Sequence, residues 1–115
     1  MKLDMDLVRD LLLQIESLKP YEGFLIIEKD KLIDAEHIEL LIEANLIKGS
    51  VKLLYPRIPD IKVFRLTWEG HQFLETIRDD KVWRNTKSTL SKAGSFTLDL
   101  IQKVAVDIIT KQINS

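Results

Sequence analysis

Hydrophobic residues recur every three or four positions in several stretches of the chain, the pattern of a helix with one buried face. The first stretch covers residues 4–18 and ends at Lys19-Pro20, because the residue before a proline avoids helical geometry. The second covers about residues 34–44, with Asp34 as the expected N-cap and Asn45 as the residue that ends it. Two helices are therefore predicted in the first 45 residues.

Shorter apolar runs predict strands. Residues 24–27 are bulky and too few for a helix, so they are expected to form one short strand. Residues 46–55 and 61–66 are rich in Leu, Val and Ile, and the turn-forming segment 56–60 separates them. These two runs predict a β-hairpin.

Two more helices are expected in the second half. Thr67 is the predicted N-cap of a helix that starts at Trp68, and no Pro or Gly lies between Arg78 and Gly94, so one long helix is predicted through Leu90. After a break at residues 93–95, with Ser95 or Thr97 as cap, a last apolar stripe consists of Leu100, Ile101, Val104, Ala105 and Ile108. A stripe of this kind has to bury against the core or against a dimer mate.

Composition bounds the class of protein. The 115 residues suit one domain, and 45% hydrophobic with 30% charged residues is typical of an ordered globular chain. There is no cysteine, which excludes disulfide scaffolds, thiolate zinc sites and cysteine nucleophiles. The acidic start of the chain and the lack of a long apolar run predict a cytoplasmic protein with no membrane partner.

Charge is unevenly distributed along the chain. Residues 1–80 hold 11 Lys and Arg against 16 Asp and Glu, whereas residues 81–115 hold 6 against 2. A basic tail on an acidic body is typical of a nucleic-acid contact, and a neighbouring element or a dimer mate would also absorb it.

The order helix, strand, helix, hairpin, helix is that of a winged-helix domain. Residues 40–47 resemble the end of a winged-helix recognition helix, with Asn45 where glycine is usual. Residues 64–70 resemble the exit of the wing, with Phe64 and Leu66 directed inward. The predicted fold class is therefore α+β and winged-helix-like: a three-helix core with a two-stranded wing over residues 1–92, and a C-terminal amphipathic helix over residues 93–115.

One departure from that pattern concerns the helix-turn-helix. Between the first strand and the wing only residues 29–45 are available, and one good helix fits there. The first helix of the motif is expected to have shrunk to a turn around residues 29–33. This shortening argues against insertion of the second helix into a DNA groove.

A resemblance also runs through most of the chain. Residues 1–2, 4–9, 66–74 and 77–80 and the pair Val82-Trp83 resemble a family of small bacterial and prophage proteins that is known only as a domain of unknown function. The resemblance implies a phage or mobile-element context and a regulatory role linked to DNA, by analogy of fold.

Acidic side chains line the expected outward face of the second helix. They are Glu36, Glu39 and Glu43, with Asp34 at the start. Because duplex DNA carries one negative charge about every 1.7 Å, such a face is repelled by phosphates. The face is either simply solvated or a docking surface for a basic protein partner.

Basic side chains gather on the predicted hairpin and at residues 81–92. The hairpin set is Lys48, Lys52, Arg57, Lys62 and Arg65, and the helical set is Lys81, Arg84 and Lys87, with Lys92 beyond. Either set suits contact with phosphates. Lysines on a hairpin also protect edge strands from pairing with other chains. Trp83, among the helical cations, is expected in the core, the alternative being stacking on a base.

Catalytic and metal signatures are missing from the sequence. No phosphate loop, dinucleotide fingerprint or metalloprotease motif is present, and neither His37 nor His71 has a partner at a ligand spacing. No cofactor and no metal is therefore expected, and the protein is predicted not to be an enzyme. Asp79 and Asp80 are expected in a helix-end or salt-bridge role, and Trp68 and Phe73 in packing.

Two functions stay open from the sequence. In the first, the protein binds double-stranded DNA through the wing and the basic 81–92 segment as a regulator. In the second, it is a protein-interaction adaptor that uses the acidic helix face or the C-terminal helix. A homodimer through that last helix fits both.

Overall fold

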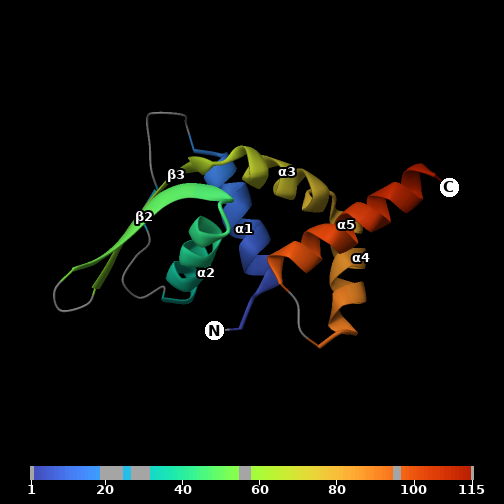
Figure 1. The fold of residues 1–115 in the computed structure, drawn as a ribbon, viewed down its shortest axis with the longest axis horizontal. Coiled ribbons are helices and arrows are strands. Elements are labelled where there is room, and N and C mark those ends of the chain that lie inside the picture. Colours follow the sequence, from blue (N-terminus) through green and yellow to red (C-terminus); the bar gives the residue numbers. More distant parts are fainter. Residues whose placement is uncertain (1, 19–24, 27–31, 55–57, 95–96, 115) are drawn as a thin grey trace.

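The computed structural model describes residues 2–18, 25–26, 32–54, 58–94 and 97–114. Its elements in chain order are α1 (Met5–Glu16), β1 (Leu25–Ile26), α2 (Leu32–Glu43), β2 (Ile47–Leu54), β3 (Ile58–Leu66), α3 (Trp68–Ile77), α4 (Asp80–Ser91) and α5 (Leu98–Ile113) (Figure 1). The predicted α+β class and the predicted antiparallel hairpin are confirmed. The molecule measures 54 × 33 × 19 Å, with the hairpin at one end of the long axis and α4 and α5 toward the other.

The hairpin belongs to a three-stranded antiparallel sheet in the order β1-β3-β2. Its inner face carries the buried side chains Ile47, Ile61, Val63 and Leu66, and α1 packs on β3 while α2 packs on β2. The predicted turn over residues 56–60 is too long, because β3 already begins at Ile58 and Pro59 is paired with Leu53. A proline is tolerated there because, among the described residues, β1 pairs with Lys62 and Val63 and the part of β3 around Pro59 is paired with β2 alone.

The first two helices follow their predicted patterns with one shift. Asp4 caps α1 by accepting a hydrogen bond from the Leu7 amide at 3.1 Å. Helix α2 begins at Leu32, so Asp34 lies in its first turn and is not the N-cap. A carboxylate there is still favoured by the partial positive charge of the helix N-terminus. Asn45 ends this segment with a φ of 61°, as predicted.

The prediction of one long third helix is wrong. The chain leaves helical geometry at Asp79, whose φ and ψ are −68° and 129°, and α4 starts at the next residue. The Asp79 carboxylate accepts a hydrogen bond from the Val82 amide at 3.0 Å and so caps α4. From α1, the Arg9 guanidinium donates to the carbonyl oxygens of Ile77 and Arg78 at 3.0 and 2.6 Å. These contacts satisfy both helix ends, so the break needs neither proline nor glycine.

The last helix packs on its own chain. Thr97 is the N-cap, accepting a hydrogen bond from the Leu100 amide, and α5 lies against α3 and α4. Ile101 and Ala105 are fully buried, whereas Leu100, predicted within the stripe, is 37% exposed, because it lies one residue, about 100° of rotation, from Ile101. A homodimer through α5 stays a prediction. In the part of the chain that the structure describes, no helix combines the length and the apolar character needed to cross a bilayer.

Candidate nucleic-acid interface

A corner of hydrogen bonds fixes the base of the hairpin. The Thr67 hydroxyl donates to the Asn45 carbonyl at 2.7 Å and accepts from the Gly70 amide at 2.9 Å. The Thr67 amide donates to the Leu46 carbonyl at 3.0 Å. Thr67 thus caps α3, as predicted, and also holds the end of β3 beside the start of β2. The strands leave the core from a rigid corner.

Just beyond this corner the two strands contain a bulge. Lys48 pairs with Arg65, but the next residue, Gly49, pairs with Val63, so Phe64 is an extra residue in β3. A Cβ atom on Gly49 would lie 2.6 Å from the Lys62 carbonyl oxygen. A glycine at this position therefore permits the close approach of the strands at the bulge.

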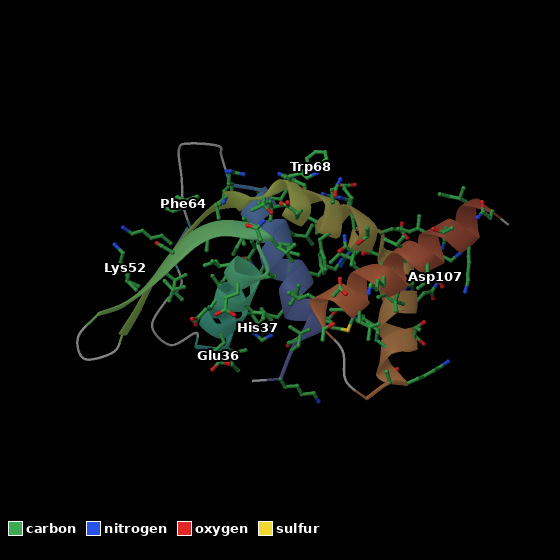
Figure 2. All side chains as sticks on the ribbon, in the orientation of Figure 1. Glu36, His37, Lys52, Phe64, Trp68 and Asp107 are labelled. Carbon is green, nitrogen blue, oxygen red and sulfur yellow. The ribbon has the colours of Figure 1, made fainter. Side chains whose placement is uncertain are left out.

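The bulge corrects the prediction that Phe64 points inward. Regular alternation from the buried Leu66 would turn Phe64 toward the core, since side chains two apart share a face. The extra residue shifts the alternation, so Val63 is buried and Phe64 is 44% exposed. Figure 2 shows Phe64 projecting from the hairpin, away from α2.

Four of the five predicted hairpin cations lie on the outer face of the sheet. They are Lys48, Lys52, Lys62 and Arg65, all with exposed side chains. Arg57 lies outside the described residues. In the sequence from residue 46 to residue 66 the single acid is Asp60, which is paired with Lys52. We call these four cations together with Phe64 the outer sheet face.

The predicted acidic face of α2 is present and flanks the hairpin. Glu36, Glu39 and Glu43 are exposed, and α2 packs against β2, the edge strand of the sheet. Within the described residues, none of these three carboxylates is in an ion pair with Lys or Arg. Figure 2 shows Glu36 on the side of α2 away from the outer sheet face. Negative potential therefore lies next to the basic strands.

The second basic segment is remote from the first. Lys81 and Arg84 are exposed on α4 and Lys92 follows it, but α4 and the hairpin lie toward opposite ends of the long axis (Figure 1). The structure therefore does not join the predicted wing and the 81–92 segment into one surface.

Lys87 and Trp83 serve a contact between α1 and α4. Trp83 is buried, as predicted, and its indole Nε1 donates to the Asp6 carboxylate at 2.9 Å. The Lys87 ammonium donates to the same oxygen at 2.9 Å and lies 5.8 Å from the centre of the Trp83 ring. The hydrogen bonds from Lys87 and Trp83 lower the pKa of Asp6 below its usual value. Lys87 is therefore engaged in holding the fold.

The ends of α3 and α4 account for the two adjacent aspartates. Asp79 caps α4, and Asp80 accepts a hydrogen bond from Arg9 at 2.8 Å, so the predicted structural role is confirmed. Arg78 donates to the Glu16 carboxylate of α1 and lowers the pKa of that group. These contacts at the ends of α3 and α4 therefore stabilise the fold.

The two histidines occupy different environments. His37 is buried, its Nε2 accepts from the Asp4 amide at 2.9 Å, and its Nδ1 lies 2.8 Å from the Ile33 carbonyl. This is the neutral tautomer with the proton on Nδ1, which joins α1 to α2. His71 is exposed on α3. Among the described residues no three His, Cys, Asp or Glu side chains converge as metal ligands would.

Trp68 is a second correction. Predicted to pack, it is 70% exposed at the top of Figure 2, because the buried face of α3 is formed by Gly70, Phe73, Leu74 and Ile77. Trp68 and His71 border a shallow groove of about 460 Å³ that Val106 of α5 lines from the other side. This groove lies apart from the outer sheet face.

The fold and the site together define a small α+β domain whose hairpin presents a basic, aromatic outer sheet face. The chain belongs to the family described as "Hypothetical protein (DUF2513)", whose model matches residues 2–96. It is 35% identical to an "Uncharacterized protein" of Haemophilus influenzae over 120 residues, covering 98% of this chain and 99% of that protein. No solved structure matches the chain. The predicted membership of a family of unknown function is confirmed.

Proposed function

We propose that this protein is a non-enzymatic nucleic-acid-binding module that holds the phosphate backbone on its outer sheet face. The observation that carries the proposal is the alignment of Lys48, Lys52, Lys62 and Arg65 on one exposed face of β2 and β3. Cations in a row along a strand neutralise successive phosphates and release their counterions. The hydrogen-bonded corner at Thr67 holds the base of the hairpin in place, so little conformational freedom is lost on binding.

The mode of binding differs from groove reading by a recognition helix. A winged-helix arrangement is supported by the element order and by the pairing of β1 with β3. Helix α2 would then be the reading helix, but its exposed side carries Glu36, Glu39 and Glu43. Carboxylates at a phosphate-lined groove cost binding energy. The proposal therefore assigns nucleic-acid binding to the hairpin. A regulatory role in mobile elements is part of the proposal only because of the resemblance to a prophage-associated family.

The proposal is tested by salt-dependent binding to a forked DNA that has both a duplex stem and single-stranded arms. With four cations engaged, the slope of log K against log salt is expected to be about −2.8 to −3.6, so binding weakens roughly 50- to 150-fold between 50 and 200 mM salt. The double variant Lys48→Glu, Lys52→Glu is expected to lose about half of this slope.

A matched control is available on α4. The variant Lys81→Glu, Arg84→Glu changes net charge by the same amount at the far end of the molecule. It is expected to keep the slope of the wild type. Equal losses in both variants, or no binding of the wild-type protein at 50 mM salt, would refute the proposal.

A second candidate function is a protein-interaction adaptor that uses α2. It is favoured by the spacing of Glu36, Glu39 and Glu43, which places three exposed carboxylates on neighbouring turns of one helix. Decalysine is then expected to bind the wild-type protein and to lose binding in the Glu39→Lys, Glu43→Lys variant. The control Asp99→Lys, Asp107→Lys carries the same charge change on α5. Equal binding by all three proteins would contradict this function.

A further inference from the structure

The bulge in β3 places an aromatic side chain, Phe64, among the cations of the outer sheet face. Phe64 is the extra residue of β3 and is 44% exposed, although regular alternation would bury it. Bulges commonly re-aim a side chain at a functional site. An exposed phenylalanine on a sheet face loses the burial that normally stabilises such a residue. The exposed ring of Phe64 favours a role on the outer sheet face.

Cations surround the ring on the same face. Lys62 lies two residues before Phe64, Arg65 follows it, and Lys48 is the residue paired with Arg65 on β2. The Arg65 guanidinium donates to the Leu66 carbonyl at 3.0 Å, which holds it against the sheet. A flat aromatic ring among cations is the combination that binds a base by stacking and its phosphates by charge.

We infer that the ligand of the outer sheet face is single-stranded nucleic acid, with one base stacked on Phe64 and the flanking phosphates on Lys48, Lys62 and Arg65. This inference rests on the proposed function and names its substrate class. Stacking on a side chain requires an unpaired base with an accessible face, whereas bases inside a duplex are covered by their neighbours.

The width of the sheet also favours a single strand. The major groove is about 12 Å wide and admits a two-stranded ribbon. At Phe64 the sheet is three strands wide, because β1 pairs with Lys62 and Val63 on the side of β3 opposite β2. With strands about 4.8 Å apart, the three backbones alone span roughly 10 Å before any side chain is added. This width disfavours insertion of the outer sheet face into a duplex groove.

The length of the outer sheet face determines how many nucleotides it can contact. Lys48 and Lys52 lie four residues apart on β2, about 13 Å at the rise of a strand. This distance corresponds to about four nucleotides at the spacing of a stacked strand. A short site of this kind is at the lower end of single-strand binding platforms.

The test compares labelled 12-nucleotide oligo(dT), oligo(U) and a 12-base-pair duplex in fluorescence anisotropy at fixed salt. Tighter binding of at least one single strand than of the duplex is expected. Phe64→Leu keeps an apolar side chain but removes the stacking ring, and we expect it to weaken single-strand binding about 5- to 150-fold. Phe64→Trp keeps a stacking ring and is expected to bind single strands about as tightly as the wild type. Neither variant should change duplex binding.

A direct readout of stacking comes from 2-aminopurine placed in the single strand. Its fluorescence is expected to change on binding to the wild-type protein and to Phe64→Trp, and to change much less with Phe64→Leu. Circular dichroism serves as the control that each variant is folded.

The outcomes separate this inference from the proposed function. If duplex and single strands bind equally and Phe64→Leu binds within twofold of the wild type while Lys48→Glu, Lys52→Glu does not, the outer sheet face binds nucleic acid but the single-strand inference fails. If none of the three probes binds at 50 mM salt, both fail. A preference for oligo(dT) or for oligo(U) supports the inference and identifies the source of the strand.

Discussion

The substitution Gly70→Ala tests the corner that supports the hairpin. Gly70 is buried in the first turn of α3. A Cβ atom there would lie 1.9 Å from the carbonyl oxygen of Leu46 and 2.9 Å from its carbonyl carbon. Both atoms belong to the backbone and neither can rotate away. Alanine therefore has to push the start of β2 away from α3 by more than 1 Å, the distance from 1.9 Å to an ordinary contact.

The magnitude follows from the bonds that this movement breaks. The corner holds three hydrogen bonds: from the Thr67 amide to Leu46, from the Thr67 hydroxyl to Asn45, and from the Gly70 amide to Thr67. Each contributes about 1 kcal/mol net, and overpacking costs a further ~1–3 kcal/mol. Alanine recovers about 1 kcal/mol of helix propensity relative to glycine. The free energy of unfolding should therefore fall by roughly 3–5 kcal/mol, which lowers Tm by about 10–20 °C.

The assay is urea unfolding followed by circular dichroism. Gln72→Ala, at an exposed position of the same helix, is the control and should stay within about 0.5 kcal/mol of the wild type. If Gly70→Ala unfolded at the same urea concentration as this control, the close approach of α3 to Leu46 would not be a constraint, and the account of the corner would be wrong.

Three other predictions concern the bulge, the carboxylates of α1 and the break after α3. Gly49→Ala should lose about 1–3 kcal/mol of stability in urea unfolding, because its Cβ would meet the Lys62 carbonyl at 2.6 Å; an unchanged midpoint would contradict the tight bulge. Since Asp6 and Glu16 have lowered pKa values in the folded chain, their contribution to stability is present above the unfolded pKa values of 3.8 and 4.5 and is lost as the pH falls through the folded values. Unfolding midpoints should therefore drop from pH 6 to pH 3, and less so in Asp6→Asn; an equal drop would exclude Asp6 as a source. Arg9→Gln removes the hydrogen bonds to the last carbonyls of α3 and should cost about 1–3 kcal/mol in the same unfolding assay, with faster hydrogen exchange at the start of α4; native exchange there would show that the break forms without Arg9.

The sequence predicted those features in which a side chain interacts with the backbone a few residues away. Thr67 and Thr97 cap the helices that follow them, and Asn45 takes the left-handed conformation, as their residue types predict. The hairpin also followed from its apolar runs. The two caps and the conformation of Asn45 depend on residues within about four positions of one another, so the local sequence decides them.

Contacts between distant residues decided the rest. At the break between α3 and α4 the end of α3 is contacted by Arg9, which lies 68 residues before the carbonyl of Ile77 to which it donates. A local signal did exist in Asp79, three residues before Val82, because aspartate favours N-cap positions, but no Pro or Gly accompanies it there. Helix propensity by itself therefore predicted a continuous helix.

The candidate site shows the same division. The sequence determined that Lys48, Lys52, Lys62 and Arg65 belong to a hairpin, because strand-forming residues surround them. Only the tertiary structure decided that they share the outer sheet face with Phe64, since one extra residue in β3 reverses which side chains point outward. That register is set by the pairing of β2 with β3. Pairing depends on both strands together, so neither strand's sequence determines it alone.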